Sequence, residues 1–485
     1  PALFLLASSV LCGVGHDDVR CSGLADPIAM MQLPGAAVLS DRGKRQQRLQ
    51  LLGSGQQLHR AKRRAVVGQL TAPMDGEAAS CRDHACQYGV FITELLLDFA
   101  HSLDRPAQIA LVNGGAIRGS LAAGDVTTEM IETVHGFGNN VTFLELPGAV
   151  IQELLQNMLA EHGPPGQGQA GSWLQMAGLR FQASWDGQAW VLRNVLVGQS
   201  RGEWQPLESN ATYSVATNSY IQDGNGGRNV VSSNAQSITE TDMNFAALVA
   251  QHFGTAGAVT PPTVDDRQLL VVGAEVLGQA SGTISGAECR DVACQYGVLL
   301  CDELRRYGHE AGYGTQVALY NGGGIRSSIP QGDVTWDSLF EVHPFGNVVS
   351  FFTIPGAVIP QLLAAMMAEH GPAGQGASGS FLQVAGLRFE AAWNSTGWVI
   401  VGIEVVGDDG TWLRLDEHAS YSVASNSYVR FGNGGRAVVS AAAVPLENTG
   451  PNVVNVMASL FQSHSPVAPL AADGRECLAG PCLWP

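Results

Sequence analysis

Apolar residues recur at two different spacings along the chain, and these spacings predict alternating helices and strands. In Ala149–Glu161 they fall at positions i, i+3 and i+4, the pattern of an amphipathic helix, and Tyr88–Leu103 follows the same spacing. Short apolar runs or alternation predict strands over Gln108–Val112, Thr142–Leu146, Leu179–Trp185 and Tyr213–Thr217. This mixture predicts an α/β (α+β) fold with mixed sheets covered by helices.

The same pattern occurs twice in the chain. Cys81–Asp83 returns as Cys289–Asp291, 208 residues later, and Asn113–Gly115 returns as Asn321–Gly323 at the same offset. The offset holds over about 150 residues, so the two segments differ by no net insertion. A period this long indicates a duplicated domain rather than a solenoid of short units. We therefore predict two tandem domains, copy 1 over residues 66–270 and copy 2 over residues 276–477.

Three short segments flank the two copies. Residues 1–22 include an apolar run that is too short to span a bilayer and is typical of a truncated signal peptide, with a buried segment as the alternative. Residues 23–65 hold a basic stretch, which we interpret as a solvated linker or helix. Residues 478–485 form a tail. No other segment reaches 18 uninterrupted apolar residues, so no membrane span is predicted.

Composition narrows the classes of partner. A hydrophobic content of 45% with 14% charged residues is typical of a globular protein. The net charge of −17 argues against a DNA or RNA partner, because a nucleic-acid polymer requires a basic face. A small anionic ligand held by a few arginines remains compatible with this charge.

The cysteines form three pairs with one spacing, Cys81/Cys86, Cys289/Cys294 and Cys477/Cys482. Four residues between partners suit a short disulfide-closed loop, and pairs of buried free thiols are the alternative. N-linked glycosylation sequons begin at Asn140, Asn210 and Asn394. Together these features favour an extracellular or secretory location, or a periplasm-like one in a bacterium.

A glycine-rich turn ending in arginine follows a predicted strand in each copy, over Asn113–Arg118 and Asn321–Arg326. Glycines let the backbone approach a ligand closely and present its N–H groups, here at Gly115 and Gly323. The arginine that ends each turn supplies a planar fork suited to phosphate oxygens. The turn is therefore a candidate phosphate site.

Aromatic residues accompany this turn in both copies. Phe137 and Phe345 lie in loops next to glycine, and Tyr220 and Tyr428 precede a Gly-Gly pair. Each ring either anchors its loop to the core or forms an exposed plate for a base. Stacking of a base on such a plate contributes about 1–3 kcal/mol.

Taken together, these motifs resemble the C-terminal, substrate-binding domain of the 5'-nucleotidase family. The two cysteines around Arg290, the turn Asn321–Arg326, the loop Pro344–Asn347, the segment Phe381–Phe389 and the Asn-Ser-Tyr before Gly-Gly occur in the family's order. The resemblance covers nearly all of both copies. It implies hydrolase chemistry in nucleotide catabolism and a small nucleotide or nucleoside as ligand.

The resemblance also implies roles for individual residues. It assigns phosphate binding to Arg82 and Arg118 in copy 1 and to Arg290 and Arg326 in copy 2. The base contacts Asn113 or Asn321 and stacks between Phe137 and Tyr220, or between Phe345 and Tyr428. The family's aspartate after the second Gly-Gly, which holds the ribose hydroxyls, is replaced here by Arg228 and Arg436.

Hydrolysis in the family uses two metal ions held by an N-terminal metallophosphatase domain. The sequence has no Gly-Asn-His-Asp/Glu and no His-x-His motif, and its one Asp-x-His, Asp416–His418, is expected to be a surface turn. We therefore assign no catalytic residue, no metal ligand and no cofactor to this chain. Two divalent metal ions would take part only if a metallophosphatase domain, upstream or in trans, is present to bind them.

Three functional hypotheses follow. The copies are nucleotide-binding domains of a 5'-nucleotidase-type hydrolase, or a non-catalytic nucleotide-binding protein, or a structural or adhesive surface protein with a vestigial pocket. Copy 2 is expected to bind better, because the methyl group of Ala116 would crowd an oxyanion where copy 2 has Gly324. Glycines on both sides of Phe137 would also leave its ring less pre-organised than Phe345.

Overall fold

The computed structural model describes residues 64–168, 170–198, 204–371, 378–407, 409–446 and 450–478. The expected signal segment, the basic stretch up to residue 63 and the tail after residue 478 lie outside the described residues, as does Cys482. Each copy is described here by itself.

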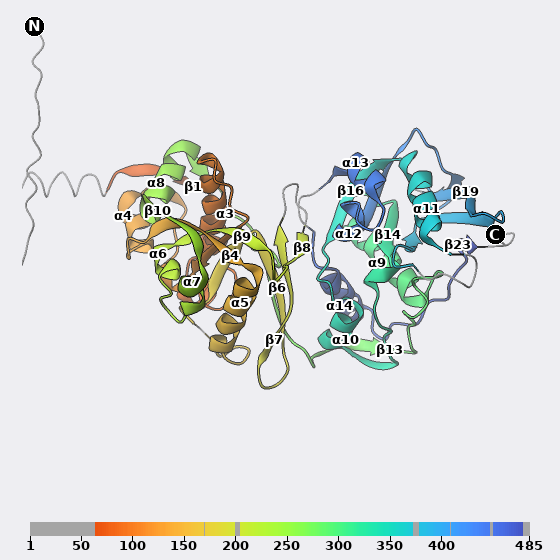
Figure 1. Ribbon diagram of the computed structural model, residues 1–485, viewed down its shortest axis with the longest axis horizontal. Coiled ribbons are helices and arrows are strands. Elements are labelled where there is room, and N and C mark those ends of the chain that lie inside the picture. Colours follow the sequence, from red (N-terminus) through yellow and green to blue (C-terminus); the bar gives the residue numbers. More distant parts are fainter. Residues whose placement is uncertain are drawn as a thin grey trace, which may run out of the picture. The chain divides into compact units, whose positions relative to one another are not determined.

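Copy 1 is built on a five-stranded sheet in the order β10-β4-β9-β2-β5 (Figure 1). β2 runs parallel to β9, whereas β4 and β5 run antiparallel to the strands beside them, so the sheet is mixed as predicted. The strands are β2 (Ile109–Asn113), β4 (Asn140–Pro147), β5 (Leu174–Ala177), β9 (Thr212–Asn218) and β10 (Gln236–Asn244).

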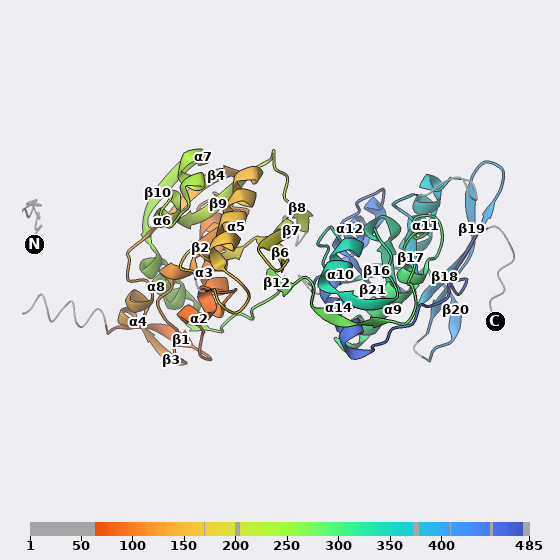
Figure 2. The same cartoon turned by 90° about the horizontal axis from the view of Figure 1, so that it is seen from below.

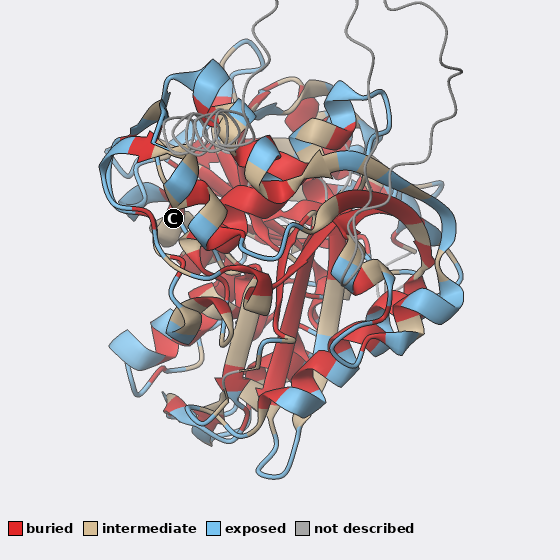
Figure 3. Cartoon of the chain, turned by 90° about the vertical axis from the view of Figure 1, so that its left-hand side faces the viewer, coloured by how far each residue is buried: buried red, intermediate tan, exposed pale blue. Residues whose placement is uncertain are grey.

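Two long helices cover the two faces of this sheet, α3 (Gln87–Ser102) and α5 (Gly148–His162). Alternate residues of a strand point to opposite faces. Ala110 and Val112 of β2 accordingly join the core beneath α3, and Ile109 and Leu111 join the core beneath α5. The central strands are buried while the outer sides of the helices face solvent (Figure 3). Each fully buried leucine or isoleucine stabilises this arrangement by about 1.5–3 kcal/mol.

A second sheet of copy 1 has the order β12-β6-β7-β8, with β12 parallel to β6. Arg267, next to β12, ties this sheet to α3 and β5. Its guanidinium donates to the Glu94 carboxylate at 2.9 Å, to the Met176 carbonyl at 2.8 Å and to Asp265 at 2.5 Å. The strands are β6 (Leu179–Trp185), β7 (Trp190–Gly198), β8 (Trp204–Pro206) and β12 (Gln268–Val272).

The start and the end of copy 1 lie side by side. The strand β1 (Val66–Leu70) pairs with β11 (Ala258–Val259) and packs against α8 (Phe245–Ala256), as both views show (Figures 1 and 2). On its other side β1 pairs with β3 (Gly124–Thr127). These contacts bring the two ends of copy 1 together, as is common in domains, whose chain ends often lie close to each other.

Copy 2 repeats the same plan, with a five-stranded sheet in the order β17-β14-β21-β16-β22 and a four-stranded sheet in the order β20-β19-β18-β23. Its long helices are α9 (Gln295–Glu310) and α11 (Val358–Glu369). The strands are β14 (Val317–Asn321), β16 (Val349–Pro355), β17 (Leu382–Ala385), β18 (Leu387–Trp393), β19 (Trp398–Val406), β20 (Trp412–Arg414), β21 (Ser420–Asn426), β22 (Val444–Pro445) and β23 (Glu476–Leu478). The strand β13 (Val276–Ala280) pairs with β15 (Gly332–Thr335).

Candidate functional site

The topology of the central sheet brings the predicted site residues of copy 1 to one edge. The parallel strands β2 and β9 end at Asn113 and Asn218, and parallel strands end at the same edge. The antiparallel neighbour β4 starts there, with Val141 opposite Asn218, so the loop that holds Phe137 arrives at this edge. β5 also starts there, because Leu174 pairs with Asn113.

Two asparagines join the ends of the parallel strands. Asn218 donates its side-chain amide to Oδ1 of Asn113 at 3.0 Å, and its own Oδ1 caps α6 (Ser219–Gln222) by accepting from the Ile221 N–H at 2.9 Å. Tyr220 sits on this capped turn. Asn218 therefore fixes both the base-contact candidate Asn113 and the backbone that carries Tyr220.

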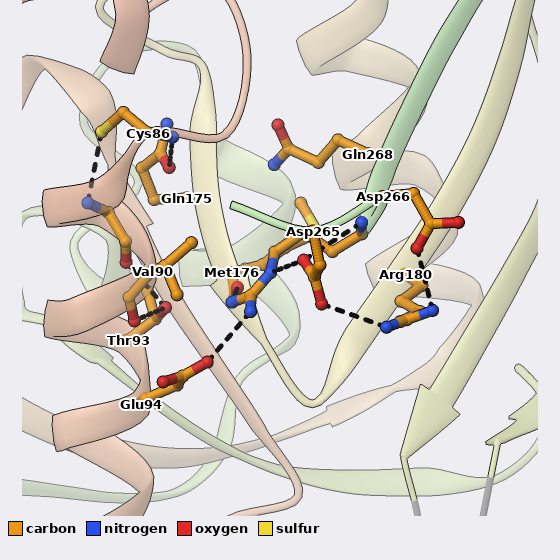
Figure 4. A network of polar contacts seen from close by, with 12 residues as sticks. Cys86, Val90, Thr93, Glu94, Gln175, Met176, Arg180, Asp265, Asp266 and Gln268 are labelled. Carbon is orange, nitrogen blue, oxygen red and sulfur yellow. Dashed lines mark hydrogen bonds and ion pairs between the residues drawn. The ribbon is translucent and has the colours of Figure 1, made fainter. Parts of the chain in front are cut away.

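The loop that carries Arg82 is closed by a disulfide between Cys81 and Cys86, whose Cα atoms are 5.0 Å apart. Gln175 of β5 holds this loop from inside: its amide donates to the carbonyls of Cys81 and His84, and its Oε1 accepts from the Cys86 N–H at 3.0 Å. Figure 4 shows Gln175 facing Cys86. The Arg82 backbone is thereby fixed at the site.

The two candidate phosphate arginines of copy 1 carry charge without a carboxylate partner among the described residues. Nε of Arg82 is buried and has no hydrogen-bond partner there. The Arg118 guanidinium lies over the Phe137 ring, 5.3 Å from its centroid. A buried guanidinium nitrogen without an acceptor is poorly satisfied, and neither arginine is neutralised by a carboxylate among the described residues.

All six copy 1 site residues predicted from the sequence line one cavity of about 520 Å³, which lies within the range of small-molecule sites. They are Arg82, Asn113, Gly115, Arg118, Phe137 and Tyr220. Phe137 is 62% exposed and Tyr220 is 38% exposed, so neither ring is buried as a core anchor. The described lining includes arginine and asparagine but no carboxylate, which suits an anionic aromatic ligand.

Copy 2 gathers most of its predicted residues in the same way. Asn321, Gly323, Phe345 and Tyr428 line one pocket. The Arg326 guanidinium lies 5.7 Å from the Phe345 ring centroid. Neither Arg290 nor Arg326 lines this pocket. The Arg290 carbonyl accepts from the Ser378 N–H at 2.9 Å, next to Gly379 of the lining. The Cys289–Cys294 disulfide closes its loop, with Cα atoms 4.9 Å apart.

The family model described as "5'-nucleotidase, C-terminal domain" matches residues 66–233 and 276–441, more than half of the chain. The chain belongs to this family. Both matched segments fall inside the two copies that the repeat predicted, and the family model is that of the C-terminal domain, whereas the family's metals are carried by its N-terminal domain.

The chain is similar to parts of several known proteins. The chain is 26% identical over 217 residues to a 5'-nucleotidase of Diplobatis ommata, a match covering 42% of this chain and 37% of that protein. It is 31% identical over 122 residues to the NAD 5'-nucleotidase of Haemophilus influenzae, covering 24% and 20% respectively. A 5'-nucleotidase precursor of Thermus thermophilus superposes with a TM-score of 0.41 at 26% identity, covering 46% and 42%. The chain thus spans less than half of each of these relatives.

Arg228 and Arg436, which follow the second Gly-Gly pair of each copy, each act as a clasp that holds two loops together, and Arg228 also lines the copy 1 cavity. Arg228 is 3% exposed, and its guanidinium donates to the carbonyls of Asn225, Gly226 and Ser172. Arg436 makes the same contacts with Asn433, Gly434 and Ser380. Burial lowers the pKa of both arginines, while Glu161 and Glu369 act in the opposite direction. Each clasp ties the Gly-Gly loop to the loop that precedes β5 or β17.

The expectation that the methyl group of Ala116 crowds an oxyanion is wrong. Ala116 is 5% exposed and belongs to the hydrophobic core beneath α3. A Cβ built on the equivalent Gly324 would lie 2.7 Å from Cε1 of the Tyr320 ring and 3.3 Å from Oδ1 of Asn321. Copy 1 has room for this methyl because Val112 stands where copy 2 has Tyr320. The difference between the copies therefore lies beneath the turn.

Sequence reasoning missed the residues that support the site, Gln175 and Gln383, Asn218 and Asn426, and the loop glycines Gly171 and Gly379. Gln383 repeats every contact of Gln175, to the Cys289 and Val292 carbonyls and the Cys294 N–H. A signal was present, since each pair keeps the offset of 208 residues. Their partners, however, are distant in sequence, so their role appears only in the folded chain.

Asp416–His418 forms the expected turn before β21, with the His418 N–H donating to Asp416 Oδ1 at 2.9 Å. Over the described ranges, no group of three or more His, Cys, Asp or Glu side chains is placed to hold a metal ion. No helix within those ranges is long and apolar enough to cross a bilayer.

Proposed function

We propose that the two copies are nucleotide- or nucleoside-binding modules of a 5'-nucleotidase-type hydrolase, in which phosphate is held by paired arginines and the base stacks between aromatic rings. One observation carries the proposal: Arg82 and Arg118, without a carboxylate partner in the described structure, line the same cavity as Asn113, Phe137 and Tyr220. Hydrolysis would need a metallophosphatase domain, upstream or in trans. A secreted or periplasmic setting fits the two disulfides.

Calorimetry of the whole chain with a nucleoside 5'-monophosphate tests this proposal. Arg326→Ala should weaken binding at copy 2 by about tenfold to a hundredfold, because a charge-assisted hydrogen bond contributes about 1.5–3 kcal/mol. We expect Arg118→Ala to have the smaller effect on total affinity, since copy 2 is expected to be the tighter site. Arg414→Ala, an exposed arginine on β20, is the matched control and should leave binding unchanged.

The outcomes separate the candidate functions. A larger loss with Arg118→Ala would show that copy 1 is the principal site. No heat from the unmutated chain would favour a structural or adhesive surface protein with a vestigial pocket, an alternative motivated by the Arg228 and Arg436 clasps in the place of the family's aspartate.

Catalysis is tested separately. The purified chain is expected to leave AMP intact with or without Zn²⁺, Mn²⁺ or Mg²⁺, because the sequence lacks the family's metal-binding motifs. Phosphate release is the measurement. Metal-dependent turnover that is lost on a point substitution within this chain would overturn the expectation.

A further inference from the structure

The three sequons for N-linked glycosylation lie in different settings within the fold. Asn394 lies at the tip of the hairpin between β18 and β19, Asn210 lies in the turn before β9, and Asn140 is the first residue of β4 in the central sheet. A glycan is bulky and hydrated, so the folded chain can carry one only where the asparagine side chain faces solvent. The three asparagines can therefore be ranked by their surroundings.

The Asn394 side chain organises a tight local turn. Its Oδ1 accepts from the backbone N–H groups of Thr396 at 3.2 Å and Gly397 at 3.1 Å, and from the Thr396 hydroxyl at 2.9 Å. Residues 394–396 are exposed, and a Cβ built on Gly397 would meet no atom within 4 Å. Because these three bonds all go to Oδ1, none of them occupies the amide nitrogen, Nδ2.

This turn brings together the two groups that glycosylation uses. In that reaction the asparagine Nδ2 forms a bond to the anomeric carbon of an oligosaccharide, the bond from that carbon to a lipid pyrophosphate breaks, and Nδ2 loses one proton. The lipid-pyrophosphate-linked oligosaccharide is the co-reactant. The sequon requires a hydroxyl two residues after the asparagine, and the Thr396 hydroxyl already contacts the Asn394 amide group. The turn forms within four residues, so the chain can adopt it before the domain has folded.

Asn140, by contrast, is tied into the central sheet. Its Nδ2 donates to the Glu240 carboxylate of β10 at 3.1 Å, and its sequon hydroxyl, on Thr142, is fully buried. Thr142 Oγ1 has no hydrogen-bond partner among the described residues, so it does not contact the Asn140 amide. A sugar on Asn140 would disturb the contact with Glu240 where β10 pairs with β4.

Asn210 is the intermediate case. Asn210 and Thr212 are both exposed, but no side-chain hydrogen bond joins them in the described part of copy 1. Their turn is held against the start of α5, where the Gly148 N–H donates to the Ala211 carbonyl at 2.8 Å. Exposure alone therefore favours this sequon, without the local turn that surrounds Asn394.

The corresponding hairpin of copy 1 has the same turn without the sequon. Asp186 lies 208 residues before Asn394, and its Oδ1 accepts from the backbone N–H groups of Gln188 and Ala189, both at 2.8 Å. These donors lie two and three residues after the acceptor, as they do in the Asn394 turn. The two copies thus share the turn geometry, and only copy 2 places an amide and a hydroxyl in it.

We propose that Asn394 is an acceptor of an N-linked glycan, presented for transfer by its turn with Thr396, and that Asn140 stays unmodified. The proposal takes from the proposed function only the secretory setting and is independent of nucleotide binding. Its chemistry is that of an exposed amide beside a hydroxyl, with a lipid-linked oligosaccharide as the donor.

Secretion of the whole chain from a eukaryotic host, behind a cleavable leader, tests the proposal. The leader ensures entry into the secretory pathway, so a bare Asn394 would count against the acceptor and not against the setting. Peptide N-glycosidase in heavy-oxygen water converts each glycosylated asparagine to a labelled aspartate, which mass spectrometry assigns. We expect label on Asn394, less on Asn210 and none on Asn140. An unlabelled Asn394, a labelled Asn140, or higher occupancy at Asn210 than at Asn394 would each overturn the proposal.

Variants of the turn test the two groups separately. Asn394→Asp removes the acceptor and keeps the turn, since Asp186 makes the same turn in copy 1, and it should abolish the gel shift of one glycan. Thr396→Ala should abolish the same shift, whereas Thr396→Ser keeps the hydroxyl and should retain the glycan. A shift that persists in Thr396→Ala would overturn the role of the hydroxyl.

The reverse experiment moves the sequon into copy 1. The double variant Asp186→Asn/Gln188→Thr places an amide and a hydroxyl in the Asp186 turn and should add one glycan. Asp186→Asn alone lacks the hydroxyl and is the matched control, which should add none. If the double variant stayed bare while Asn394 carried its glycan, the shared turn would not be what presents the amide, and the geometric basis of the proposal would be overturned.

Discussion

The two copies repeat the same motif residues but differ in which of them line the pocket and in what lies one layer below. Arg82 and Arg118 line the copy 1 cavity with Asn113, Phe137 and Tyr220, whereas Asn321, Phe345 and Tyr428 line the copy 2 pocket without Arg290 or Arg326. Beneath the turn, copy 1 has the apolar pair Val112 and Ala116, whereas copy 2 has Gly324 and Tyr320, whose hydroxyl lies 3.2 Å from Nδ1 of His343. The same motif can therefore stand on different support.

A second difference lies where the returning strand joins each copy. In copy 1, Trp173 donates its indole N–H to Gln268 at 2.9 Å. In copy 2, Phe381 has no donor, and Glu476 instead accepts from the Val384 N–H at 3.0 Å. Burial raises the pKa of Glu476 to about 8. One copy thus holds this position with a neutral amide and the other with a titratable acid.

The largest expected effect concerns this acid. The unfolded chain ionises Glu476 near pH 4.5, whereas the folded chain keeps the proton until about pH 8. The contribution of protonated Glu476 to stability is therefore fully present below pH 4.5, decreases as pH rises above 4.5, and is lost once pH has passed about 8. The slope is at most about 1.4 kcal/mol per pH unit. Glu476→Gln, which copies Gln268, should flatten this slope in copy 2.

Denaturant unfolding at pH 5 and pH 8, followed by hydrogen exchange in each copy, checks the effect. Gln268→Glu is the matched variant and should introduce the same pH dependence into copy 1. If Glu476→Gln left the pH slope of copy 2 intact, the acid would have no part in it.

The next effect tests the pairs beneath the turn. Gly324→Ala should destabilise copy 2 by about 1–3 kcal/mol, because the added methyl group meets the Tyr320 ring. Tyr320→Val in the same chain should restore most of this loss by recreating the copy 1 pair. The measurement is denaturant unfolding. Failure of the second substitution to rescue the first would show that the two copies do not fill this space equivalently.

The smallest effect is one that the copies should share. Replacing both cysteines of a pair with serine should destabilise either copy by about 1–2 kcal/mol, because only five positions separate Cys81 from Cys86 and Cys289 from Cys294. Comparison of thermal midpoints checks this, with a non-reduced digest to confirm the disulfides in the parent chain. A loss confined to one copy would break the equivalence of the Arg82 and Arg290 loops.

Much of the fold followed from local patterns. The helices predicted over Tyr88–Leu103 and Ala149–Glu161 match α3 and α5 to within one residue at each end. Both carry an apolar stripe at helical spacing, and such a stripe has to meet a sheet to be buried. The constant offset predicted the duplication, because a second copy with the same spacing needs the same fold.

Side-chain direction at the site did not follow from the sequence. Arg228 lines the copy 1 cavity, but its guanidinium also donates to three backbone carbonyls, two of them in the loop that Gly226 (φ 65°) and Gly227 (φ 78°) turn. Ala116 reads as a neighbour of the ligand, but its methyl group points into the core. Both depend on backbone angles that residue type alone does not specify.

By itself, the sequence predicted the two copies, the helices and strands named above, the two disulfide loops and six of the residues that line the copy 1 cavity. These features are encoded by periodicity, by the fixed offset and by short motifs, all of which are local or repeated. Only the tertiary structure decided what lies behind the motifs, because the Tyr320 hydroxyl lies 3.2 Å from Nδ1 of His343, which comes from the segment before β16. Contacts between strands distant in sequence form only when the sheet is assembled, so the difference between the copies is a property of packing.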